Sequence, residues 1–316
     1  MWAPPMLLAL SLNPPGASAA NVEASLLSEL SAVARSAPFY VGIRMKIRRG
    51  WHIYWKNPGD SGLPPRITWT LPKGFVAGPI EWPIPHRSAE NDLMTYGYDR
   101  DVILPVRITP PRTLEGDSIT IQGKLDWLEC ADVCVPGSTE LRLSLAVSSG
   151  PAPPSPDAPA LAAARARLPV SPEGWSFSAE AGPRAIALDF VPPKGIAPRG
   201  GYLFVDKPLV TEHAAPQGFE RTGNGYRLTL LPAANAAGNL ARLSGVLVIE
   251  DAGHFKNRIG VNLDVPVVPG DPAPAPVKTE RPGWPILAYA ALLGIAGLGL
   301  WIQLYRARRK HSNTNR

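Results

Sequence analysis

Cysteine is almost absent from this sequence, because Cys130 and Cys134 are the two in 316 residues, within the stretch "WLECADVCVPG". The two are spaced as CxxxC, and no CxxC pair or HxxC arrangement frames them. Two sulfurs do not complete the tetrahedral ligand set of a zinc site, so the composition argues against structural zinc. Three interpretations stay open, namely a redox-active dithiol, a structural disulfide and a copper(I) site formed by two thiolates.

A strong charge imbalance is also absent. The chain has 32 basic and 26 acidic residues, a net charge of +6, and several of the basic residues lie in the C-terminal tail. We find no basic stripe interleaved with aromatic residues, the pattern by which nucleic-acid-binding surfaces are recognised. We therefore expect no nucleic-acid partner.

Proline and glycine are abundant, with 37 and 29 residues, which excludes a helical bundle because proline breaks helix interiors. The segment "FYVGIRMKIR", residues 39–48, alternates strictly between apolar and polar residues, which predicts a half-buried strand. The segments 22–30, 101–108, 119–127 and 141–147 also read as strands. Short strands separated by frequent turn signals predict an all-β sandwich.

A second block, residues 171–267, repeats this pattern without cysteine. Its expected strands are 175–179, 185–190, 202–205, 226–230, 245–250 and 261–265. Two proline-rich stretches, 149–170 and 268–283, are typical of extended spacers. They predict two modules in tandem, the first covering residues 20–148, with a linker between them and a stalk after the second.

The two ends of the chain predict a membrane-anchored protein outside the cytoplasm. Residues 1–19 resemble a signal peptide with an apolar run and a small-residue cleavage site, although a basic start is missing. Residues 284–305 carry no charge and are long enough for a transmembrane helix. The basic tail, 306–316, then faces the cytoplasm. The modules would occupy an oxidising compartment in which a disulfide persists.

The spacing of the cysteines restricts their geometry. Four residues along one strand span about 13 Å, too far for a disulfide. The residues at i and i+4 of a helical turn lie on one face, so we expect a short turn carrying both thiols between a strand ending near Trp127 and a return strand. The pair would then sit at a loop tip, where functional residues concentrate.

The size of the loop favours redox exchange over a structural staple. A loop this short removes little entropy from the unfolded chain, and a module of about 125 residues can build a core without it. Copper(I) binding by the two thiolates stays open, with Met45, Met94, His52 and His86 as candidate additional ligands.

Four motifs in the first block occur in a recognisable order: "GWHIYWKNPGDSGLPPRITWTLPKGF" (50–75), "GPIEWPIPHR" (78–87), "LMTYGYDRDVILPV" (93–106) and "LDWLECADVCVPG" (125–137). Together they resemble the N-terminal periplasmic region of DsbD-type thiol–disulfide interchange proteins, in the ScsB-like branch linked to copper tolerance. The resemblance covers about residues 21–265, including "VTEHAAPQGF" (210–219).

The resemblance implies an immunoglobulin-like sandwich that bears the redox pair. With the sequence patterns above, we therefore expect an all-β chain of two immunoglobulin-like β-sandwich modules in tandem, followed by one C-terminal transmembrane helix. The resemblance also implies that Cys130 and Cys134 are the redox pair and that Cys134 forms the mixed disulfide with a partner. Further residues match segments expected to pack around or cap the pair, and they are Trp55, Asn57, Tyr96, Tyr98 and Trp127. For each, a place in the sandwich core or a turn is an equally good interpretation. The segment 94–98 would form a shielding loop.

The implied activity is that of a thiol–disulfide oxidoreductase of the protein-disulfide reductase type in the bacterial periplasm, needing no cofactor or metal. Family members continue into a multi-span electron conduit, whereas this sequence has one cysteine-free span. We therefore expect a separate membrane-embedded electron donor and a periplasmic disulfide-bearing substrate protein, in cytochrome c biogenesis or copper tolerance. A non-catalytic interaction module with a structural disulfide is the alternative.

Overall fold

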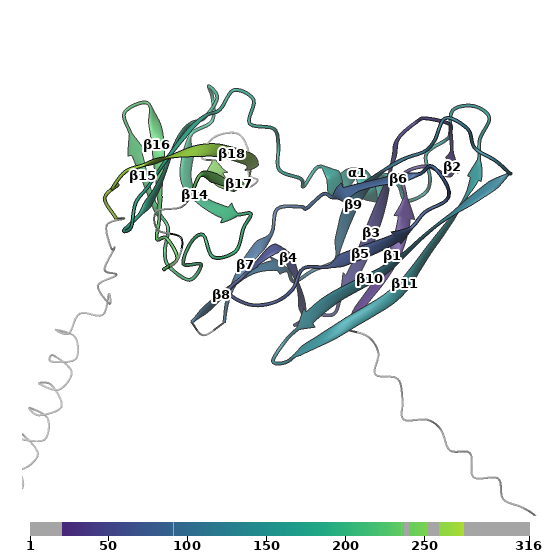
Figure 1. The fold of residues 1–316 in the computed structure, drawn as a ribbon, viewed down its shortest axis with the longest axis horizontal. Coiled ribbons are helices and arrows are strands. Elements are labelled where there is room, and N and C mark those ends of the chain that lie inside the picture. Colours follow the sequence, from purple (N-terminus) through teal and green to yellow (C-terminus); the bar gives the residue numbers. More distant parts are fainter. Residues whose placement is uncertain (1–20, 91, 235, 237–239, 252–258, 275–316) are drawn as a thin grey trace, which may run out of the picture. The chain divides into compact units, whose positions relative to one another are not determined.

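β-Strands form nearly all of the regular structure in the computed structural model, which describes residues 21–274 except 91, 235, 237–239 and 252–258 (Figure 1). The expected signal peptide, membrane span and basic tail lie outside the described residues. Within the described part, no helix is long and apolar enough to cross a membrane. The prediction of an all-β chain with immunoglobulin-like sheets is confirmed.

The first sandwich consists of two sheets that enclose one core. The smaller sheet has the order β1 (Val22–Ser28), β3 (Phe39–Ile47), β9 (Val102–Thr109) and β6 (Val76–Ile80). The larger has the order β2 (Ala32–Val33), β11 (Cys134–Val147), β10 (Ser118–Cys130), β4 (His52–Gly59), β8 (Leu93–Tyr98) and β7 (His86–Glu90), with β5 (Arg66–Thr70) also paired to β10.

The alternation in β3 sets the inner face of the smaller sheet. Phe39, Val41, Ile43 and Met45 are almost completely buried. They belong to the same cluster as apolar residues of the facing sheet, among them Ile121 of β10. Each Å² of apolar surface removed from water stabilises the fold by about 25 cal/mol. This cluster is therefore the main stabilising feature of the first sandwich.

The second sandwich is built from one continuous path of hydrogen-bonded strands around a separate apolar cluster. The order is β14 (Pro198–Val205), β17 (Arg242–Asp251), β18 (Ile259–Pro269), β12 (Ser176–Ala181), β13 (Ile186–Val191), β16 (Gly225–Leu230) and β15 (Gly218–Thr222). The six strands expected from the sequence are present. β15, which lacks clear alternation, was not predicted.

The linker between the sandwiches contains a helix where an extended spacer was expected. The helix α1 spans Ala158–Arg165, and its residues Leu161 and Ala164 are buried. Alanine, leucine and arginine favour helix, and a proline is tolerated in the first turn. The guanidinium of Arg165 lies 3.9 Å from the ring centroid of Tyr40, and a Cβ on Gly42 would lie 3.3 Å from Leu161 Cγ. The helix is therefore docked on the first sandwich.

We predict that Leu104→Ala lowers the free energy of unfolding by about 2–5 kcal/mol, because this side chain of β9 is fully buried. Leu93→Ala in β8 is the matched control, since Leu93 is 47% exposed and should cost less than about 1 kcal/mol. Urea denaturation of the oxidised protein measures both. Equal effects of the two substitutions would contradict the assigned core.

Candidate redox site

The disulfide closes the tip of a long β-hairpin. β10 and β11 pair in antiparallel register from Ser118 opposite Ala146 to Cys130 opposite Cys134, and residues 131–133 connect them. The sulfurs are bonded at 2.05 Å, and the two Cα atoms are 4.1 Å apart. The expected helical turn is therefore wrong. Both cysteines lie in strands, but on opposite arms of the hairpin, where directly opposed residues approach to about 4.5–5.5 Å.

The two cysteines differ in their exposure. Cys130 is 1% exposed, whereas Cys134 lies on the exposed side of the hairpin tip next to Val133, which is 64% exposed. Thiol–disulfide exchange requires a direct approach of one sulfur to another. Of the two residues, Cys134 is therefore the more accessible from solvent, whereas Cys130 is buried.

Tyr54 of β4 contacts the disulfide and was missed by the sequence analysis. Its hydroxyl donates a hydrogen bond to Cys130 Sγ at 2.9 Å and lies 3.8 Å from Cys134 Sγ. Its oxygen is also 3.2 Å from Nε2 of His52, which sits opposite Cys130 in the β4–β10 register. Alternation in "HIYW" places residues 52 and 54 on one face, but the sequence did not show that β10 would be the neighbouring strand.

A glycine allows the chain to cover Tyr54. Gly62 has a φ of +106°, and a Cβ there would lie 2.2 Å from the Tyr54 ring. A side chain at position 62 would therefore displace either the ring or the segment over it. The tyrosine is 2% exposed as a result, which fixes its hydroxyl against the sulfurs.

Trp127 lies on the other face of β10 from Cys130, because successive side chains of a strand alternate. Its indole Nε1 donates to Glu129 Oε2 at 3.0 Å, and Asn21 Nδ2 donates to the other carboxylate oxygen at 3.1 Å. The indole lies across Gly137, where a Cβ would lie 2.2 Å from the ring. Trp127 therefore packs against the hairpin on the face opposite Cys130.

Trp55, Asn57 and Tyr96 contact the second sandwich. The Trp55 ring meets Phe204 edge to face at 6.0 Å, and Asn57 Nδ2 donates to the carbonyl oxygen of Val205 at 2.9 Å. The Tyr96 hydroxyl lies 2.7 Å from that of Tyr202. The contacts of these three candidates for the cap are thus with the second sandwich and not with the sulfurs.

Tyr98 is also part of the sheet. The segment 94–98, expected to be a loop, lies in strand β8. Tyr98 pairs with Ile53 of β4, and its buried hydroxyl donates to the carbonyl oxygen of Pro83 at 2.7 Å. The expectation of a loop is wrong because pairing with β4 and β7 satisfies the backbone of this segment as a strand.

Histidine and carboxylate side chains do not gather around the pair as a metal site would require. Among the described residues, no three His, Cys, Asp or Glu side chains form a group that could hold a metal ion. The chemistry that the described geometry supports directly is that of the two sulfurs and the Tyr54 hydroxyl.

The described residues thus contain an immunoglobulin-like β-sandwich with a disulfide at the tip of a hairpin. Residues 23–146 match the family model described as "Thiol:disulfide interchange protein DsbD, N-terminal". Over these residues the chain is similar to the DsbD N-terminal family. The comparison with curated protein sequences gives no match.

The likeness to one solved structure extends over both sandwiches. The N-terminal periplasmic domain of ScsB from Proteus mirabilis has a TM-score of 0.58 and 19% identity, covering 82% of this chain and 96% of that one. At this identity the likeness concerns the fold. A variant of the major pilin subunit of Bacillus cereus also matches, with a TM-score of 0.25, 10% identity and coverage of 78% of this chain and 68% of that one.

Burial keeps the groups between Tyr96 and the second sandwich uncharged. It raises the pKa of both Tyr96 and Tyr202. It lowers the pKa of His213, against the opposing effect of the Asp60 and Glu212 carboxylates. His213 Nδ1 lies 3.2 Å from the Tyr96 hydroxyl, so a neutral imidazole can accept a hydrogen bond from this hydroxyl.

We predict that His213 makes the protein less stable in acid. The unfolded state binds this proton near the usual pKa of 6.5, whereas the folded state binds it only at lower pH. Its contribution is therefore complete above pH 6.5 and is lost as the pH falls toward the lower folded pKa. Urea denaturation measures the free energy of unfolding, which should decline less between pH 7 and pH 5 in His213→Gln than in the unaltered protein. An equal decline in the two proteins would contradict this prediction.

We predict that Tyr54→Phe makes the reduction potential of the disulfide more negative by about 10–30 mV. A thiolate accepts a hydrogen bond more strongly than a disulfide sulfur, so the loss of one bond, about 0.5–1.5 kcal/mol, falls mainly on the reduced state. Equilibration with glutathione at neutral pH measures it. Tyr98→Phe, which removes a buried hydroxyl bound to Pro83, should leave the potential unchanged. An unchanged reduction potential in Tyr54→Phe would contradict the inference that the Tyr54 hydroxyl stabilises the reduced state.

Proposed function

We propose that the chain is a membrane-anchored periplasmic thiol–disulfide oxidoreductase. In this proposal the Cys130–Cys134 pair passes two electrons from a membrane-embedded donor to a disulfide-bearing periplasmic protein. The observation that carries the proposal is the unequal pair at the hairpin tip, with Cys134 exposed, Cys130 buried and Tyr54 bonded to the buried sulfur. The match of residues 23–146 to the DsbD N-terminal family supports it.

The electron-accepting half begins when a donor thiolate attacks the exposed Cys134 sulfur. The Cys130–Cys134 bond breaks, a donor–Cys134 mixed disulfide forms, and Cys130 leaves as a thiolate. The Tyr54 hydroxyl, 2.9 Å from Cys130 Sγ, is placed to stabilise the negative charge that develops there. A second donor thiolate then attacks the donor sulfur of the mixed disulfide, which leaves the donor oxidised and both cysteines reduced.

The electron-donating half reverses these roles. The Cys134 thiolate attacks a disulfide of the substrate protein, forming a mixed disulfide and releasing one substrate thiolate. Cys130 then attacks the Cys134 sulfur, restores the internal disulfide and releases the second substrate thiolate. Two electrons and two protons are thereby transferred to the substrate, and no bound cofactor takes part. We assign the substrate to the periplasmic disulfide proteins of cytochrome c biogenesis or copper tolerance.

The proposed roles of the surrounding residues follow from their places. Trp127 holds the hairpin through Glu129, and Trp55, Asn57 and Tyr96 hold the other side of the larger sheet against the second sandwich. Tyr98 ties β8 to the segment containing Pro83. In this proposal they position β4 and β10, and so position the sulfurs, without taking part in exchange.

Trapping of mixed disulfides tests the proposal. In the full-length chain, Cys130→Ala should accumulate a mixed disulfide between Cys134 and partner proteins, because the resolving thiol is gone. The matched variant Cys134→Ala should accumulate far less, since Cys130 is buried. Acid quenching, alkylation and non-reducing electrophoresis measure both.

The reduction potential of the unaltered pair separates exchange from a structural bond. We expect a value between about −120 and −270 mV, the range of exchange proteins. A value below about −300 mV, together with no trapped partner in Cys130→Ala, would overturn the proposal and leave a structural disulfide.

A further inference from the structure

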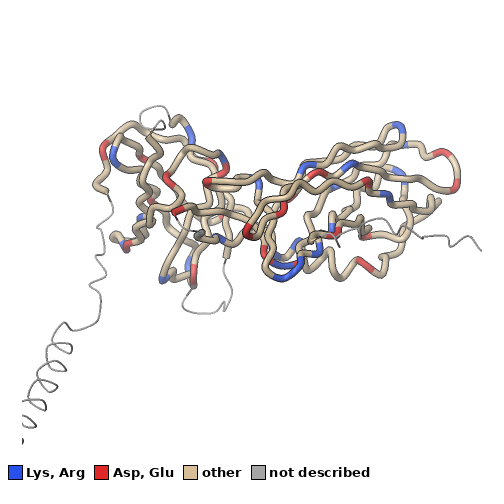
Figure 2. The backbone as a smooth tube through the Cα atoms, turned by 90° about the horizontal axis from the view of Figure 1, so that it is seen from below, with Lys and Arg blue, Asp and Glu red and all other residues tan. Residues whose placement is uncertain are grey.

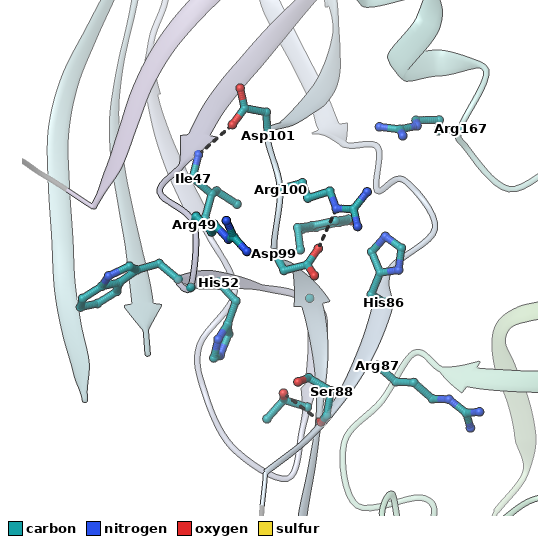
Figure 3. Close-up of a pocket in the computed structure, with 15 residues that line it drawn as sticks. Ile47, Arg49, His52, His86, Arg87, Ser88, Asp99, Arg100, Asp101 and Arg167 are labelled. Carbon is teal, nitrogen blue, oxygen red and sulfur yellow. Dashed lines mark hydrogen bonds and ion pairs between the residues drawn. The ribbon is translucent and has the colours of Figure 1, made fainter. Parts of the chain in front are cut away.

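A cavity of about 870 Å³ opens on the first sandwich, with His52 among the residues that line it (Figure 3). Its lining comes from the β3–β4 turn, from β7 and β8, from the segment that follows β8 and from the segment after α1. Four arginines line it, namely Arg49, Arg87, Arg100 and Arg167, all of them exposed. We call this cavity the basic pocket. The wider distribution of charged residues is seen in Figure 2.

The acidic side chains of the basic pocket do not balance these arginines. Asp99 and Asp101 are its two carboxylates. Asp99 lies 3.9 Å from Arg100 Nε, and Asp101 accepts a hydrogen bond from the backbone nitrogen of Ile47. Four cations facing two anions leave an excess of positive charge, even with neutral histidines.

Two of the arginines are available to a ligand. The structure records no ion pair or side-chain hydrogen bond for Arg49 or Arg167 among the residues it describes, whereas Arg87 lies over the ring of Tyr202 at 4.4 Å. Arg167 is held to the first sandwich because its backbone carbonyl accepts a hydrogen bond from Ile84. Guanidinium groups bind carboxylates through paired hydrogen bonds, so these two are suited to an acidic partner.

His52 connects the basic pocket to the sulfurs. It lines the cavity, it sits opposite Cys130 across the β4–β10 pairing, and its Nε2 is 3.2 Å from the Tyr54 hydroxyl that contacts the disulfide. A chain segment that fills the basic pocket would therefore lie one side chain away from the Tyr54–disulfide contact.

We infer that the basic pocket docks an acidic segment of the protein that exchanges disulfides with Cys134. Aspartate or glutamate side chains near the partner's reactive cysteine would bind Arg49 and Arg167 and orient its sulfur toward Cys134. This inference rests on the proposed function and adds the chemistry of the partner. Complementary charge raises association rates by about 10–10³-fold, and salt weakens the effect.

Exchange with charged disulfide peptides tests the inference. The probes are two peptides of equal length with one internal disulfide, flanked by glutamates in one and by lysines in the other, and neutral hydroxyethyl disulfide. The reduced full-length protein should react at least about tenfold faster with the glutamate peptide than with the lysine peptide at low salt. At 1 M salt, where the screening length is about 3 Å, this ratio should fall below about twofold.

Two double variants with the same charge change localise the effect. Arg49→Glu with Arg167→Glu should abolish or invert the glutamate-to-lysine rate ratio. The control is Arg35→Glu with Arg112→Glu, two exposed arginines near the Ser36–Pro111 hydrogen bond, outside the basic pocket. The control should keep most of the ratio, and thermal unfolding should show that both variants fold.

An equal loss of the ratio in both variants would overturn the inference, because the preference would then follow overall charge. A ratio near one in the unaltered protein, while hydroxyethyl disulfide still oxidises the pair, would also overturn it and leave the proposed function intact. If the reduced pair reacts with none of the three disulfides, the proposed function itself fails.

Discussion

The unbroken antiparallel pairing of β10 with β11 determines where the two sulfurs lie. Because the register runs without a shift from Ser118 to Cys130, the last pair of the hairpin must be Cys130 and Cys134. The same ladder aligns Trp127 with Gly137, whose missing side chain leaves room for the indole. A change of one residue in this register would move one cysteine to the opposite face and separate the sulfurs.

Strand β4, which pairs with β10, makes contacts on both faces of the larger sheet. Its residue Tyr54 meets the disulfide, and its neighbour Trp55 meets Phe204 of the second sandwich. Two adjacent residues of one strand point to opposite faces, so a single short element serves both contacts. The second sandwich, which has no sulfur of its own, thereby packs against the strand that supplies the hydroxyl to the redox pair.

The sequence predicted the strands better than it predicted the site. Alternation identified β3 because its inner face is apolar throughout, and the cysteines were correctly expected at a tip. The turn was misassigned because a helical turn and a three-residue hairpin connection both bring residues four apart together. Tyr54 was missed and Tyr96 was assigned to the cap because the choice between tyrosines depends on which strand pairs with β10, a long-range property that local pattern does not contain.

The central place of β18 has a consequence for biosynthesis. This strand, Ile259–Pro269, pairs with β17 on one side and runs parallel to β12 on the other. It is the last strand of the second sandwich in the chain, yet it joins the β14–β17 pair to the group formed by β12, β13, β16 and β15. One edge of β12 must therefore wait unpaired until the ribosome has made the partners of its residues, such as Val267 opposite Ala179. Such late, non-local closure is slow and exposes strand edges, so a holding chaperone would protect β12 while the chain is being made.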